Sequence, residues 1–156
     1  MNRWQEHFSG QMDALCSQST SSFDQFVEER IDPAAEELAA FLEKWNYEVT
    51  QPASEAGRCT YRFGLTEDAY MLIWFQKEGF DTVQCDYEYS LPSVGRTQGS
   101  HTSIKQRSAD KEWVDTCFQT ALDAFVGKYT EIINRGGSSS NSSNKQQQQL
   151  VESAGW

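Results

Sequence analysis

The sequence predicts an α+β domain in which a long N-terminal helix, a four-stranded antiparallel meander and a long C-terminal helix form an α-β4-α two-layer sandwich. Three patterns predict this fold. Apolar residues recur every three or four positions over residues 23–45 and again over residues 114–132, which is the period of an amphipathic helix. Between these segments, apolar and polar residues alternate with the period of two that half-buried strands show.

The first long helix contains Pro33, which removes one backbone donor and clashes with the preceding turn. Two interpretations compete. Asp32 could cap a new helix with Pro33 as its first residue, or a single helix could bend at the proline. The apolar phase continues unbroken through Pro33, which favours one kinked helix.

Residues 1–21 precede this helix, and a stripe within them predicts a short amphipathic helix over residues 3–16. The Ser/Thr-rich run at residues 17–22 is expected to end it. Whether the segment docks on the domain or stays mobile is left open by the sequence. The residues of the stripe are Trp4, Phe8, Met12 and Leu15.

Four strands are expected to follow, joined by turns too short for parallel crossovers. Pro92 is expected to close the sheet, so that residues 92–108 form a long loop containing several cations and no acid. A loop of this length in a compact domain is typically functional or disordered. The strands are expected at residues 46–51, 58–65, 70–75 and 82–91.

The second long helix is expected to begin after Ser108, which serves as its N-cap, and to stop at Arg135, where two glycines follow. A single domain is therefore expected over residues 22–135. Residues 136–156 are rich in Ser, Asn and Gln, and this low-complexity composition predicts a disordered tail, either natural or an engineered linker.

The chain of 156 residues carries a formal net charge of −10 and has a pI near 4.6. An acidic surface repels phosphates and anionic lipids, so the charge argues against nucleic acid and membrane as partners. No leader or apolar run of about 20 residues is visible. The cysteines are widely spaced among apolar neighbours, so we expect buried thiols and a reducing cytoplasmic location: Cys16, Cys59, Cys85 and Cys117.

No motif supports catalysis, a cofactor or a metal site. The two histidines, His7 and His101, are far apart, and no carboxylates stand at zinc-ligand spacing around them. Asp86 and Glu88 point to the same side of one strand, but polar neighbours indicate a solvated face rather than an acid–base pair. The glycines of residues 92–108 lack the lysine and the strand-to-helix setting of a phosphate loop. The sequence therefore favours a non-enzymatic protein.

Two features predict a binding surface. The strand at residues 70–75 is apolar on both sides, and a helix layer on only one side would leave aromatic surface exposed. The first helix carries a strongly acidic face. The candidate partner surface comprises Tyr70, Leu72, Trp74, Phe75, Glu28, Glu29, Glu36 and Glu37, and the candidate anion-binding loop contributes Arg96, His101, Lys105 and Arg107.

Three functions follow as hypotheses. The first is a protein-binding module, self-associating as a homodimer through the sheet. The second is a small-ligand protein or enzyme that uses the basic 92–108 loop against the sheet. The third is an acidic inhibitor or immunity-type protein that places its first helix in a basic groove of its partner.

Overall fold

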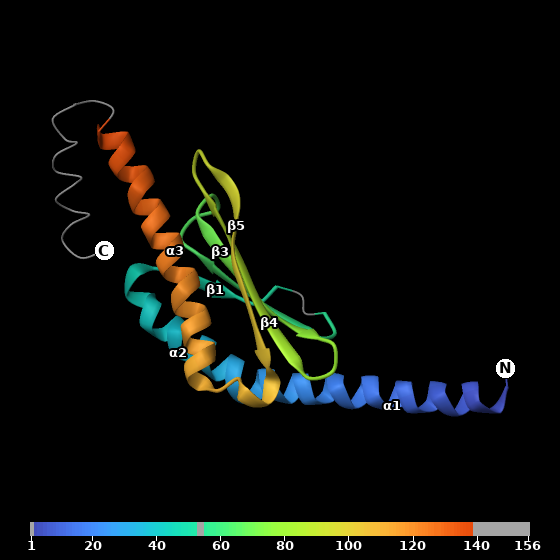
Figure 1. The fold of residues 1–156 in the computed structure, drawn as a ribbon. Helices are drawn as coiled ribbons and strands as arrows, with labels where there is room; N and C mark the ends of the chain where they lie inside the picture. The colour runs from blue at the N-terminus through green and yellow to red at the C-terminus, as the bar shows by residue number, and fades with distance from the viewer. Residues whose placement is uncertain (1, 53–54, 139–156) are drawn as a thin grey trace. The chain divides into compact units, whose positions relative to one another are not determined.

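The computed structural model describes residues 2–52 and 55–138. The chain divides into two compact units, Met1–Ala121 and Leu122–Trp156. The α+β class is confirmed, with a long N-terminal helix, an antiparallel sheet and a C-terminal helix (Figure 1). Residues 139–156 of the predicted tail lie outside the described residues, and the predicted domain limits at residues 21 and 135 stay a prediction.

The sheet has five strands rather than the expected four, and each pairs antiparallel with the next one along the chain. The central pairing is extensive, with Gly64 opposite Tyr70 at one end of the β2–β3 ladder and Glu78 opposite Thr82 at one end of the β3–β4 ladder. The strands are β1 (Glu48–Thr50), β2 (Arg58–Gly64), β3 (Tyr70–Glu78), β4 (Thr82–Leu91) and β5 (Gly95–Lys105).

The fifth strand corrects the expectation of a loop at residues 92–108. Pro92 does not close the sheet but lies in a tight turn, in which the Val94 N–H donates to the Leu91 carbonyl at 3.2 Å. Ser93 and Gly95 adopt positive φ angles of 71° and 78°, which reverses the chain into β5. Because β5 is an edge strand with largely exposed side chains, it lacks the apolar alternation that identifies a buried strand.

The N-terminal helix is longer than expected. α1 (Arg3–Phe26) runs through the Ser/Thr-rich segment that was predicted to end it, so the short separate helix is wrong. The buried Ser19 explains this, since its Oγ donates to the Phe80 carbonyl at 3.0 Å and ties the helix to the β3–β4 turn. Tertiary contact overrides the weak helix propensity of serine here.

The chain stays helical through Pro33, as predicted, but the irregularity precedes the proline. A π turn (Val27–Ile31) connects α1 to α2 (Asp32–Leu42). In this wide turn the Asp32 N–H donates to the Val27 carbonyl, five residues back. Such a turn is a recognised way for a helix to absorb an interruption.

One face of the sheet forms the core of the first unit. Phe118, on the part of α3 (Lys111–Ser138) that belongs to this unit, makes edge-to-face ring contacts with Tyr61, Phe63 and Phe75, at centroid separations of 5.5–5.8 Å. Asp32 of α2 accepts a hydrogen bond from the Tyr61 hydroxyl on the same face. Both helices therefore pack against one side of the sheet.

The second unit begins at Leu122, within α3. Its helix reaches Ser138, past the expected stop at Arg135, because glycine lowers helix stability by only about 1 kcal/mol and does not forbid the conformation. Glu131 forms ion pairs with Lys128 and Arg135, which are three and four residues away on the same side of the helix. These pairs support the exposed helix locally.

Three of the four cysteines are buried, but Cys16 is exposed on α1, which corrects that expectation. The Cys85 and Cys117 thiols lie together between β4 and α3. Their mutual hydrogen bond and burial raise the pKa of Cys85 far above its ordinary value. Burial likewise raises the pKa of Cys59. These thiols are poor nucleophiles.

The Tyr61–Asp32 contact leads to a pH prediction. Burial, followed by this hydrogen bond, raises the pKa of Tyr61 well above its ordinary 10.0. Above pH 10 the unfolded tyrosine therefore loses its proton while the folded one keeps it, so stability is full below pH 10 and falls as the pH rises. We expect Tyr61→Phe to lower the free energy of unfolding by about 1–3 kcal/mol at neutral pH.

Above pH 10, the free energy of unfolding should fall with pH more steeply for the wild type than for Tyr61→Phe. The difference between the two slopes should be about 1.4 kcal/mol per pH unit. Urea unfolding followed by circular dichroism at a series of alkaline pH values measures both quantities. Parallel pH dependences for the two proteins would show that Tyr61 ionises normally in the folded state.

Candidate binding face of the sheet

The face of the sheet opposite the core carries a mixed row of aromatic and charged side chains. We call it the open face. On β2, β3 and β4, residues of this face alternate with buried residues, and most of them are half-exposed. It comprises Arg58 and Arg62 from β2, Tyr70, Leu72 and Trp74 from β3, Asp86 and Glu88 from β4, and Arg96 and His101 from β5.

Two arginines of β2 lie over two aromatic rings of β3. The Arg58 guanidinium carbon is 4.8 Å from the centre of the Trp74 ring, and that of Arg62 is 4.5 Å from the centre of the Tyr70 ring. Each arginine reaches diagonally to the residue two positions before its cross-strand partner, a separation that long side chains span. The two pairs therefore repeat the same geometry along the sheet.

Gly64 makes room for the second pair. A Cβ atom at this position would lie 2.4 Å from the Arg62 Nη1 atom, so the guanidinium occupies the space that any other residue would fill. Within the described residues, no ion pair links Arg58 or Arg62 to a carboxylate. Their in-plane N–H groups keep the capacity to bind one.

The carboxylates of the open face already have partners on β5. The largely buried Glu88 pairs with Arg96, and this hydrogen bond raises the pKa of the arginine. Asp86 lies 2.9 Å from the Nδ1 atom of His101 and also accepts a hydrogen bond from Gln84. Asp86 and Glu88 thus share a face, as expected, but each has its own partner on β5.

Three of the four residues of the candidate anion loop lie on the edge strand β5, and each of the three contacts a carboxylate. Besides Arg96 and His101, Lys105 contacts both carboxylate oxygens of Asp81, at 3.1 and 3.2 Å. Arg107 lies in the turn after β5 and is exposed. An anion binding to Arg96, His101 or Lys105 would therefore compete with an existing carboxylate contact.

The structure separates the aromatic residues of the candidate partner surface. Tyr70, Leu72 and Trp74 lie on the open face and remain half-exposed. Phe75 lies on the other side, is fully buried, and contacts the rings of Trp113 and Phe118. Its place in the predicted surface is therefore wrong, because both helices cover that side of β3.

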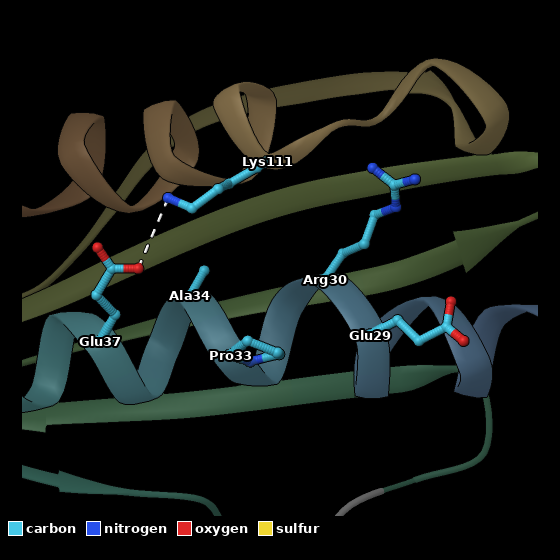
Figure 2. Close-up of a pocket in the computed structure, with 6 residues that line it drawn as sticks. All are labelled: Glu29, Arg30, Pro33, Ala34, Glu37 and Lys111. Carbon is cyan, nitrogen blue, oxygen red and sulfur yellow. Dashed lines mark ion pairs between the residues drawn. The ribbon is translucent and has the colours of Figure 1, made fainter.

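Two of the four acidic residues of the candidate partner surface, Glu29 and Glu37, line a groove between the helical segment around Pro33 and the start of α3 (Figure 2). Glu37 lies 3.7 Å from Lys111 across the groove, while Arg30 projects from the π turn, seven residues before Glu37. The groove contains two adjoining cavities of about 300 and 270 Å³. Glu29 lines the first cavity, and Glu28 and Glu36 are exposed.

This groove carries charges of both signs, so it does not form a uniformly acidic surface. Asp115, and then Glu37, raise the pKa of Lys111, which keeps its ammonium charged between them. The second cavity is more apolar, with Leu38, Phe41 and Phe118 among its lining residues. The third hypothesis, an acidic helix entering a basic groove, stays a prediction.

Comparison with protein family models, with curated proteins and with solved structures finds no match. Within residues 2–52 and 55–138, no three metal-binding side chains cluster around a common point. The helices among these residues are too short or too polar to span a bilayer. The geometry of the open face is therefore the basis for a functional proposal.

Sequence reasoning missed Arg58 and Arg62. They were recognised only as the polar positions of an alternating strand, because a charged residue there is normally just solvated. The signal lies in the β2–β3 register, which follows from the short Leu65–Ala69 connection and sets both arginines diagonal to aromatic residues. The pairing of two arginines with two rings identifies a surface that neither strand indicates alone.

Proposed function

We propose that this protein is a non-enzymatic binding module whose open face receives an acidic segment of a partner protein. The observation that carries the proposal is the pair of ring-stacked arginines, Arg58 and Arg62, which lack carboxylate partners among the described residues. A stacked guanidinium is held in place before binding, so it loses little rotamer freedom when a carboxylate arrives.

The apolar residue between these two pairs supports a peptide rather than a simple ion. Leu72 lies between Tyr70 and Trp74 on β3, directly opposite Arg62 on β2. A segment with alternating acidic and apolar side chains would match this row in both charge and polarity. The free buried thiols are compatible with a reducing, cytoplasmic setting, which is part of the proposal.

The test is a titration with fluorescently labelled peptides that alternate Asp or Glu with Leu. We expect the double variant Arg58→Gln/Arg62→Gln to bind about tenfold more weakly, since each exposed charge contact contributes roughly 0.5–1 kcal/mol. The matched control is Arg3→Gln/Arg107→Gln, which makes the same charge change at exposed positions outside the open face.

Equal loss of binding in both double variants would show that net charge alone causes the effect, and it would reject the proposal. Absence of binding across the peptide series would also reject it. A single-stranded oligonucleotide of matched charge serves as a counter-probe, and tighter binding of the oligonucleotide would replace a protein partner with a nucleic acid. The predicted homodimer through the sheet is examined separately, with Trp74→Arg.

A further inference from the structure

The first sixteen residues of α1, from Arg3 to Gln18, carry a stripe of apolar side chains. The rest of the first unit does not bury this stripe. Trp4 is 64% exposed, Phe8 52% and Leu15 40%, and the Trp4 and Phe8 rings contact each other edge to face at 6.3 Å. In Figure 1 this blue segment runs beyond the sheet. We call the residues Trp4, Phe8, Met12 and Leu15 the outer stripe.

The outer stripe continues a stripe that is buried farther along the same helix. Leu15 follows Trp4 by eleven residues, and Phe26 follows Leu15 by eleven more; Met12 and Phe23 have the same separation. Phe23 and Phe26 are buried in the core of the first unit. An eleven-residue repeat keeps these positions on one side of a helix. The side of α1 that is buried at Phe23 and Phe26 is therefore exposed at the outer stripe.

We propose that the outer stripe is a self-association surface, on which α1 of a second copy packs antiparallel. Charge favours this occupant. Helical geometry places Glu6 and Asp13 on the back of α1, whereas the stripe is flanked by uncharged Gln5, Gln11 and Gln18. Two copies of a chain with a net charge of −10 can therefore meet here without bringing carboxylates together.

The sizes of the side chains also fit an antiparallel pair. With the two-fold axis between residues 9 and 10, the Trp4 ring lies opposite Leu15 of the second copy, and Phe8 lies within one residue of the level of Met12. Large groups thus meet smaller ones along the whole contact. Covering the four half-exposed aromatic rings of a pair removes on the order of 400 Å² of ring surface from water, so a weak, concentration-dependent dimer is expected.

Helix stability provides a second reason for a partner. An isolated helix of about this length is marginal in water, and Ser9 and Gly10 lower its propensity further. Contacts with a second copy supply the packing that residues 3–18 lack within their own unit.

The test is sedimentation velocity of the full chain over a wide concentration range. We expect the wild type to dimerise and Trp4→Glu/Phe8→Glu to associate at least tenfold more weakly. The control, Ala14→Glu/Ser17→Glu, adds the same charge to the exposed back of the helix and should dimerise like the wild type. Circular dichroism confirms that each variant is folded.

Three outcomes would overturn the proposal. A wild type that stays monomeric at the highest concentration reached excludes self-association at this stripe. Dimers that persist in Trp4→Glu/Phe8→Glu but disappear in Trp74→Arg assign the contact to the open face. A monomeric wild type that binds zwitterionic phosphatidylcholine vesicles through Trp4 and Phe8 assigns the stripe to a lipid surface.

Discussion

Replacing Phe75 by arginine is expected to unfold the protein, whereas the same replacement at the adjacent Trp74 leaves it folded. Phe75 is fully buried against Trp113 and Phe118. Loss of the ring alone costs about 3–5 kcal/mol, and an unpaired buried charge adds several more. Small domains are stable by only about 5–15 kcal/mol, so Phe75→Arg should have no cooperative unfolding transition.

Trp74→Arg removes a half-exposed ring and its contact with Arg58, which we expect to lower the free energy of unfolding by about 1–2 kcal/mol. Urea unfolding followed by far-ultraviolet circular dichroism separates the two variants directly. A cooperative, native-like transition for Phe75→Arg would mean that the helices do not cover this side of β3.

Gly99→Ala is expected to destabilise the protein, by about 1–3 kcal/mol. β5 bulges at this point, because Asp86 faces His101 while Glu88 faces Gln98. A Cβ atom on Gly99 would lie 2.0 Å from the Tyr87 ring, which is buried and cannot move aside freely. The conformation of Gly99 does not require glycine, so the effect is steric.

Gly10→Ala is the matched control for this prediction. A Cβ atom at Gly10 meets no atom within 4 Å apart from the nearby backbone of its own helix, and the residue lies in the exposed part of α1. The same added methyl group should therefore stabilise the protein, by up to about 1 kcal/mol. Chemical unfolding of both variants tests the opposite signs, and a neutral Gly99→Ala would show that the Tyr87 ring does not pack over β5.

The sequence was sufficient to predict the fold class, because the helices and the three central strands carry clear apolar periods. It was not sufficient for β5, whose residues are polar on both sides. Arg96 and His101 face the carboxylates of β4 there rather than solvent alone. The acids Asp86 and Glu88, followed by Arg96 and His101 in the next segment, are the signal that would have revealed this pairing.

The candidate site was only partly predictable for a different reason. Alternation on β3 correctly separates Tyr70, Leu72 and Trp74 from the residues of the other side, but it does not say which side the helices cover. That choice depends on contacts distant in sequence, such as Phe118 against Phe75. The extent of α1 also depends on such a contact, between Ser19 and the Phe80 carbonyl.

The consecutive order of the strands has a consequence for how the chain folds. Each strand pairs with its sequence neighbour, so the sheet can grow by closing short loops, each at a small entropic cost. The contact of Phe118 with Tyr61, by contrast, joins distant segments and can form only once the chain has collapsed. We therefore expect Phe118→Leu mainly to speed unfolding, whereas substitutions in the β3–β4 hairpin slow folding.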